Sequence, residues 1–371
     1  MYKKFVMGIA AMAALTLVSC SSDDLDSFSG DSSKNEAISF DGYLGRSAVA
    51  VNGSRGSVVD IDALKDSANK GFGVFGYYNS SASHNSTEQT FEANLFNNQQ
   101  VTYDKTTNPA KWTYTNTKYW PTQGHIDFLA YAPYNAGTLE RIYHLKFTVA
   151  DQNKIGEQTD LLWTKLDGQT KEKNSTVTLK FSHALSRLGY TVKLNKPYAN
   201  ATITLNKITL AGSNTEPTKN AFYKEGTIDL STGKWSTLSS EDPKYNDAKQ
   251  NFVWFNNETS GKTLSNEDDK VIKNSDSEYL FVIPQNFSNG NANNDQLYVI
   301  VDYTIKYTNY DNGAISEMKY TVSSKIEKNF EQGKAYTINL NIGLTPIEFN
   351  AEVTDWVTTE NPINDIPVTW N

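Results

Sequence analysis

Two long runs of alternating apolar and polar residues, joined by a turn signal, constrain the fold of this chain more than any other feature. Every second residue from 297 to 307 is apolar or aromatic, and residues 314–322 continue the alternation. Neighbouring side chains of a strand point to opposite faces, so such alternation is typical of half-buried strands. The turn residues Asp311-Asn312-Gly313 lie between the runs, and Asn-Gly is the strongest short-range hairpin signal. We therefore predict a β-hairpin over this region.

Shorter segments along the chain carry the same strand signals, with Gly, Asn and Pro turns between them. Helical periodicity is confined to residues 62–69 and 182–187. The further predicted strands are residues 73–78, 100–103, 111–114, 126–132, 176–181, 188–194, 202–210, 279–283, 336–342 and 347–353. This pattern predicts an all-β fold, which we expect to form two tandem β-sandwich, transthyretin-like domains of Greek-key character, with few short helices.

One polar stretch indicates a domain division. Residues 165–175, with the sequence KLDGQTKEKNS, contain a single apolar residue, which is typical of a surface linker. At 371 residues, the chain is long enough for two ordinary domains. We place the division near residue 173, which gives an N-terminal domain of residues 56–172 and a C-terminal domain of residues 173–371.

The N-terminus has the features of an export signal. A positive Tyr2-Lys3-Lys4 segment precedes an apolar run, residues 5–17, which is too short to remain as a membrane-spanning helix. The following Leu-Val-Ser-Cys, which ends at Cys20, resembles the bacterial lipobox. This resemblance implies removal of residues 1–19 and acylation of Cys20, which would hold the chain at the outer membrane. The alternative is a chance cysteine after an ordinary signal peptide.

Residues 20–36 form a polar segment rich in serine and aspartate, which we interpret as a tether. An acidic run directly after a lipidated cysteine also resembles the surface-export signal of lipoproteins from Bacteroides-like bacteria. A simple solvated linker is the alternative interpretation.

Composition and motifs argue against several function classes. The net charge of −8 and the pI near 5.2 do not fit nucleic-acid binding, which needs clustered basic residues. The four histidines, His84, His125, His144 and His183, have no metal-site spacing, and neither a nucleophile elbow nor a phosphate loop is present. We expect no enzyme activity, metal or cofactor, and we expect His183 to have a packing or capping role.

Aromatic residues leave a binding role open. The tryptophans and tyrosines can stack on sugars, but their positions within alternating segments favour core and sheet-edge packing. Ser67, in Asp66-Ser67-Ala68, matches a short O-glycosylation pattern of Bacteroides.

The segment ISFDGYLGRSAVAVNGSRGS, residues 38–57, begins as a strand and ends as a loop. Ile38, Phe40 and Leu44 share one strand face. The segment also contains two of the four arginines of the chain, Arg46 and Arg55. Arg55 lies in a flexible Gly/Ser-rich setting typical of protease-sensitive loops, so we prefer it to Arg46 as a cleavage point. The alternative is that residues 38–44 form a permanent first strand.

The C-terminal segment has a matching pattern. Ile366, Val368 and Trp370 share one strand face, so this segment and residues 38–44 can fill the same kind of groove. Pro362 and Pro367 cannot donate ladder hydrogen bonds, so a strand here is short and lies at a sheet edge. We predict a donor strand within residues 360–371, and closure of its own domain is the alternative.

Nine short pieces along the chain point to a known family. They are ISFDGYLGR from residue 38, KGFGVFGYY from 70, KYWP from 118, DFLAYAP from 127, DLLWTK from 160, LKFSHALSRLGYTV from 179, YLFVIPQN from 279, GKAYTINLNIGLTPI from 333 and VTDWV from 353. With these pieces in this order, the chain resembles the fimbrillins, the type V pilus subunits of Bacteroides and Porphyromonas relatives, across essentially its whole length.

The resemblance implies two β-sandwich domains, export as an outer-membrane lipoprotein, and assembly into a cell-surface pilus that serves adhesion. A trypsin-like, arginine-specific protease would release the N-terminal strand, residues 37–55, and the C-terminal strand of a neighbouring subunit would replace it. The implied partners are other pilus subunits, that protease, the membrane, and a ligand on a host or bacterial surface. The alternatives are an uncut anchor subunit, or a surface or tip protein of the same fold that binds a glycan or a host protein.

Overall fold

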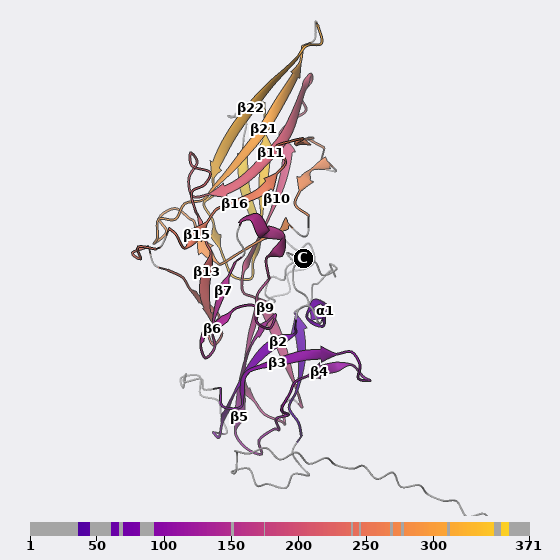
Figure 1. Ribbon diagram of the computed structural model, residues 1–371, viewed down its shortest axis with the longest axis vertical. Coiled ribbons are helices and arrows are strands. Elements are labelled where there is room, and N and C mark those ends of the chain that lie inside the picture. Colours follow the sequence, from indigo (N-terminus) through magenta and orange to yellow (C-terminus); the bar gives the residue numbers. More distant parts are fainter. Residues whose placement is uncertain are drawn as a thin grey trace, which may run out of the picture. The chain divides into compact units, whose positions relative to one another are not determined.

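The computed structural model describes residues 36–44, 61–66, 70–81, 93–149, 152–173, 175–238, 240–244, 246–267, 270–275, 278–309, 312–344 and 350–355. All of them lie within one compact unit, residues 36–371. Strands dominate this unit, which confirms the all-β prediction (Figure 1). The helical elements with described bounds are a one-turn helix, α1 (Ile61–Leu64), and a 3-10 helix, η2 (Gln152–Glu157).

The largest sheet has seven strands in the order β1-β9-β8-β5-β2-β3-β4. The edge strand β1 runs parallel to β9, and the other neighbours are antiparallel. The strands are β1 (Ser39–Leu44), β2 (Phe72–Asn79), β3 (Phe96–Asp104), β4 (Lys111–Thr113), β5 (His125–Ala132), β8 (Leu162–Gln169) and β9 (Thr176–His183).

Two five-stranded sheets hold most of the later strands. One has the order β18-β10-β24-β25 with β19 also paired to β10, and the other has the order β16-β11-β21-β22 with β17 also paired to β11. Figure 1 shows β11, β21 and β22 as long neighbouring strands. The strands are β10 (Ser186–Leu194), β11 (Ala201–Ala211), β16 (Phe252–Asn256), β17 (Lys262–Thr263), β18 (Ile272–Lys273), β19 (Leu280–Val282), β21 (Tyr298–Thr308), β22 (Ile315–Lys325), β24 (Ala335–Ile342) and β25 (Asn350–Asp355).

Smaller sheets complete the described part. A four-stranded sheet has the order β14-β13-β7-β6, and two strand pairs are β12-β15 and β20-β23. The strands are β6 (Thr138–Arg141), β7 (His144–Thr148), β12 (Phe222–Tyr223), β13 (Glu225–Asp229), β14 (Lys234–Ser236), β15 (Lys249–Gln250), β20 (Gln285–Asn286) and β23 (Asn329–Phe330).

The predicted hairpin is confirmed as the antiparallel pair β21 and β22, whose register runs from Tyr298↔Lys325 to Thr308↔Ile315. Gly313 adopts a φ of 67°, a conformation that favours glycine. The backbone N–H of Asn309 donates to the Ala314 carbonyl across the loop. The alternation and the turn residue therefore predict this pair correctly.

Buried side chains form two hydrophobic clusters. One lies on a face of the seven-stranded sheet and includes Ile38, Phe40 and Phe128. The larger cluster is built mainly from the later sheets, but Leu129 and Tyr131 of β5 also belong to it. Strand β5 is buried at every position, because its alternate residues supply both clusters.

One predicted helix is wrong. Residues 182–187 end β9 and begin β10, so no helix forms there. The backbone N–H of Ala184 donates to the Leu161 carbonyl, and that of Arg187 donates to the Lys334 carbonyl. Hydrogen bonds to distant segments thus take the place of the helical pattern. The other predicted helix is present only as α1, and residues 67–69 of that prediction lie outside the described residues.

The polar stretch at 165–175 is not wholly a linker. Its first five residues form the second half of β8, a strand that the periodicity did not reveal. Strand β9 follows the division predicted at residue 173, yet it belongs to the same sheet as β8. A cut at residue 173 would therefore divide this sheet, and the two-sandwich arrangement stays a prediction.

Candidate functional site

The groove under β1 is the candidate site, because it holds the strand, residues 38–44, that the family resemblance implies is removable. All six residues of β1 pair with β9, from Ser39↔Thr176 to Leu44↔Phe181. Just before β1, the Ile38 N–H donates to the Lys118 carbonyl (2.9 Å), and the Trp120 N–H donates to the Glu36 carbonyl (3.0 Å). The segment thus lies between β9 and residues 118–120, with paired backbone groups on both sides.

Side chains of this segment alternate as predicted. Ile38 and Phe40 are buried, with 2% and 4% of their surface exposed, whereas Ser39 and Asp41 are exposed. Gly42 is also buried and continues the inward face. Leu44 pairs with Phe181 through its backbone, and its side chain lies outside the described residues. Ile38 and Phe40 are therefore apolar plugs in the core.

Phe40 occupies an aromatic box. Its ring makes edge-to-face contacts with the rings of Phe72, Phe96, Tyr114 and Phe128, at centroid distances of 6.2, 5.5, 5.6 and 5.7 Å. Such pairs are worth about 0.5–1.5 kcal/mol beyond the burial of their area. The box thus selects a flat apolar side chain at this position of the strand.

Polar contacts fix the same segment. The Tyr114 hydroxyl donates to the Ile38 carbonyl (2.7 Å), and burial raises the pKa of this hydroxyl. The hydroxyls of Ser39 and Thr176 share a hydrogen bond of 2.9 Å. The Trp120 indole N–H donates to the Ser175 carbonyl (3.4 Å) and so links the two sides of the groove.

Loss of this segment would leave a destabilised edge. Burial of the Ile38 and Phe40 side chains contributes about 1.5–3 kcal/mol each. Strand β9 would lose its partner on one side, and an open strand edge pairs readily with another chain. The groove is apolar, and a strand with the same alternation as β1 would find the same backbone hydrogen-bonding groups on β9.

The sequence predicted the buried side chains of the first strand but not the residues that surround them. The local alternation predicted that Ile38 and Phe40 share one face, and in the structure both side chains are buried. The four rings of the box were missed, although Phe72 and Phe128 belong to the predicted strands of residues 73–78 and 126–132 or directly adjoin them. The other predicted site residues, Cys20, Arg46, Arg55, Ile366, Val368 and Trp370, lie outside the described residues, as does Ser67.

Two histidines have structural partners. His183 Nδ1 lies 2.8 Å from a carboxylate oxygen of buried Asp160, and His125 Nε2 lies 3.7 Å from Asp127. Within the described residues, no group of three or more His, Cys, Asp or Glu is arranged to hold a metal ion. The same described residues contain no helix that is long and apolar enough to cross a membrane.

Comparison with known proteins identifies the family. The sequence profile described as fimbrillin-like matches residues 65–356, most of the chain. The chain belongs to the fimbrillin-like family. The matched range includes the four rings of the aromatic box and β9, whereas β1 precedes it.

Two relatives extend this result along the chain. A fimbrium subunit of Phocaeicola vulgatus, Fim1C, is 28% identical over 389 aligned positions, which cover 97% of this fimbrillin-like chain and 98% of the relative. The crystal structure of a fimbrial protein from Bacteroides vulgatus is similar in fold, with a TM-score of 0.63 and 23% identity, and the match covers 86% of this chain and 98% of that one.

Proposed function

We propose that this protein is a structural subunit of a cell-surface fimbria that serves adhesion, and that it polymerises by strand exchange. Its membership of the fimbrillin-like family and its similarity to a fimbrium subunit over nearly the full length support this role. The main support for strand exchange is that Ile38 and Phe40 are buried in a groove bounded by β9 and residues 118–120.

The proposal orders three events. The chain is exported as an outer-membrane lipoprotein anchored through Cys20. A trypsin-like protease then cuts after Arg55, or after Arg46, both of which lie between β1 and α1 in the sequence. Residues before the cut leave the groove together with β1.

A neighbouring subunit then fills the groove. Its donor strand carries Ile366, Val368 and Trp370, which have the two-residue spacing of Ile38 and Phe40. The incoming plugs recover about 1.5–3 kcal/mol each, and each ladder hydrogen bond adds about 0.5–1.5 kcal/mol. Such a head-to-tail contact does not close on itself, so it builds a filament.

Substitution of the two arginines tests the proposed proteolytic cleavage. Replacement of both Arg46 and Arg55 by alanine is expected to abolish the ladder of polymers seen on denaturing gels without boiling. The matched control is Arg141→Ala, because Arg141 is an exposed arginine in β6 whose loss leaves the groove intact. Ladders of undiminished intensity in the double variant would contradict the proposed processing.

N-terminal sequencing of the surface-exposed form distinguishes the roles. A stalk subunit has a new N-terminus directly after Arg55 or Arg46. A chain that still begins at an acylated Cys20 within purified fimbriae would overturn the stalk role and leave the uncut anchor or the tip protein.

A further inference from the structure

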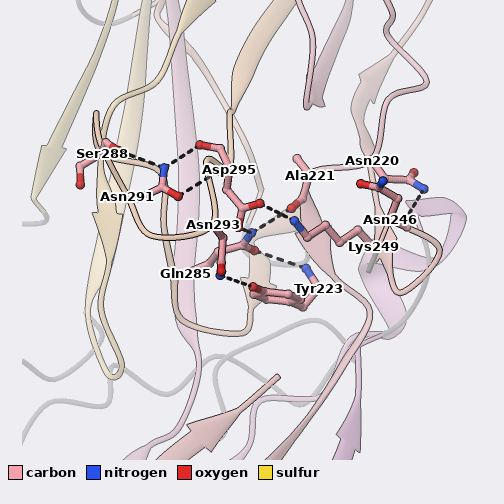
Figure 2. Close-up of polar contacts among 10 residues, drawn as sticks. All are labelled: Asn220, Ala221, Tyr223, Asn246, Lys249, Gln285, Ser288, Asn291, Asn293 and Asp295. Atoms are coloured by element: carbon pink, nitrogen blue, oxygen red, sulfur yellow. Dashed lines mark hydrogen bonds and ion pairs between the residues drawn. The ribbon is translucent and has the colours of Figure 1, made fainter. Parts of the chain in front are cut away.

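A buried lysine and a buried aspartate meet beside Tyr223, a residue of the larger hydrophobic cluster. Lys249 lies in β15, and Asp295 lies in the loop between β20 and β21, 46 positions later (Figure 2). The Lys249 Nζ and the Asp295 Oδ1 are in direct contact, and the two side chains are 4% and 6% exposed. By contrast, the partners in the pair Lys306–Glu317 are 51% and 46% exposed.

An aromatic ring packs against the lysine side of this contact. The Lys249 Nζ lies 5.2 Å from the centre of the Tyr223 ring. The adjacent Phe222 is fully buried and contacts the rings of Phe252 and Phe287. Burial lowers the pKa of the Lys249 ammonium, against the opposing effect of the Asp295 carboxylate. Burial thus increases the share of the neutral amine, which is the nucleophilic form.

The aspartate is held in a fixed orientation. Gln285 Nε2 donates to the Asp295 Oδ2 (2.8 Å) and to the Ala221 carbonyl (3.0 Å), so it connects the loop to the β12 side of the site. Asn291 accepts a hydrogen bond from the Asp295 N–H (2.9 Å) and donates to the Asp295 carbonyl (2.8 Å). Figure 2 shows these contacts converging on Asp295 from both sides. The carboxyl group therefore keeps Oδ1 toward the lysine.

We propose that Lys249 and Asp295 form an intramolecular isopeptide bond. A proton passes from the ammonium to the carboxylate, and the neutral Nζ then attacks Cγ. The Gln285 N–H stabilises the negative charge that develops on Oδ2. Oδ1 takes a second proton from Nζ and leaves as water. The ion pair thus supplies every atom: one ammonium and one carboxylate give one amide and one water molecule.

Two physical effects favour this reaction. The fold holds the amine against the carboxyl group, so a bimolecular condensation becomes intramolecular. A buried ion pair also carries a large desolvation cost, which a neutral amide does not have. The product closes a covalent loop from residue 249 to residue 295 and restricts unfolding of the enclosed strands. This bond does not depend on the strand-exchange proposal.

Tryptic digestion and tandem mass spectrometry of the intact full chain test the bond. Trypsin does not cut after an acylated lysine, so we expect residues 245–262 to appear as one peptide, joined to residues 274–306. The mass of the joined species equals the sum of the two peptides minus one water molecule. Three separate peptides, residues 245–249, 250–262 and 274–306, would overturn the proposal and leave an ordinary buried ion pair.

Substitutions test whether the isopeptide bond joins Lys249 to Asp295. Lys249→Arg keeps the positive charge but is expected to lose the joined peptide, and Asp295→Ala is expected to lose it as well. The matched control is Lys207→Arg, because Lys207 forms an exposed pair with Glu258 (3.0 Å) and its variant keeps the joined peptide. The unmodified chain gives the decisive result, so a variant that fails to fold does not remove the test. A joined peptide that persists in folded Lys249→Arg would assign the linkage elsewhere and contradict the proposal.

Discussion

At the scale of single residues, Tyr114 joins the first strand segment to the rest of the molecule through one hydroxyl group. Its ring forms one wall of the aromatic box around Phe40, and its hydroxyl donates to the Ile38 carbonyl. The same hydroxyl lies 3.4 Å from the carbonyl oxygen of Lys118, which belongs to one boundary of the groove. Tyr114 therefore contacts both the occupant of the groove and its boundary.

Tyr114→Phe tests this contact. The variant keeps the ring and loses the hydrogen bond, so we expect the free energy of unfolding to fall by about 0.5–1.5 kcal/mol at pH 7. Urea unfolding followed by tryptophan fluorescence measures the difference. Tyr103→Phe is the control, because the Tyr103 hydroxyl makes a long, weak hydrogen bond to the Ala110 carbonyl (3.5 Å). Equal stability of the Tyr114 variant and the parent chain would contradict the prediction.

The pH dependence of this difference follows from the raised pKa of Tyr114. In the unfolded chain a tyrosine ionises near pH 10, before the buried hydroxyl does, so the unfolded state binds fewer protons above that pH. The stabilisation is thus fully present below about pH 10 and is lost as the pH rises toward the folded value. We expect the gap between parent and Tyr114→Phe to shrink above about pH 10. A difference in the free energy of unfolding that stays constant as the pH rises further would contradict this prediction.

At the scale of elements, the β21–β22 hairpin depends on one turn residue. Gly313 has a φ of 67°, and a Cβ added there meets no atom within 4 Å. A larger residue therefore has space, and its only cost is conformational. The outer strand β22 is mostly exposed, with Ile315 at 69%, so its pairing with β21 relies on the ladder and the turn more than on burial.

Gly313→Ala is expected to lower the free energy of unfolding by about 1 kcal/mol, because alanine disfavours the left-handed conformation. Gly313→Asn, which adds a larger side chain that tolerates this conformation, is expected to cost less. Urea denaturation of the two variants compares them directly. An asparagine variant less stable than the alanine variant would show that space, and not conformation, limits this position.

At the scale of the whole molecule, the two hydrophobic clusters share strands. Phe128 of β5 belongs to the cluster that holds Phe40, and its neighbour Leu129 belongs to the larger cluster. Strand β2 is divided in the same way, with Phe72 in one cluster and Phe75 in the other. Unfolding of either cluster therefore removes support from the other.

We expect one cooperative thermal transition for the described unit. Phe40→Ala in one cluster and Leu205→Ala in the other are each expected to destabilise by about 2–5 kcal/mol and to move the same transition. Differential scanning calorimetry checks this. Two transitions, each moved by only one of the variants, would show that the clusters unfold independently.

Local features of the fold could be predicted from the sequence because they depend on residues that are close together in the chain. Alternation in a strand repeats every two residues, so the inward face of Ile38 and Phe40, the hairpin at Gly313 and the all-β class are all visible in short windows. The helix expected at residues 182–187 failed because its hydrogen-bond partners, Leu161 and Lys334, are outside any such window.

Long-range placement was decided by tertiary structure alone. Strand β1 pairs with β9, where Ser39 and Thr176 lie 137 positions apart, and the rings around Phe40 come from β2, β3, β5 and the segment after β4. The contact of Lys249 with Asp295 spans 46 positions and has no sequence motif. The sequence by itself determined which residues point inward, because that is a property of local backbone geometry. Which groove receives them, and which charged groups meet in the core, depends on packing between strands that are distant in the chain.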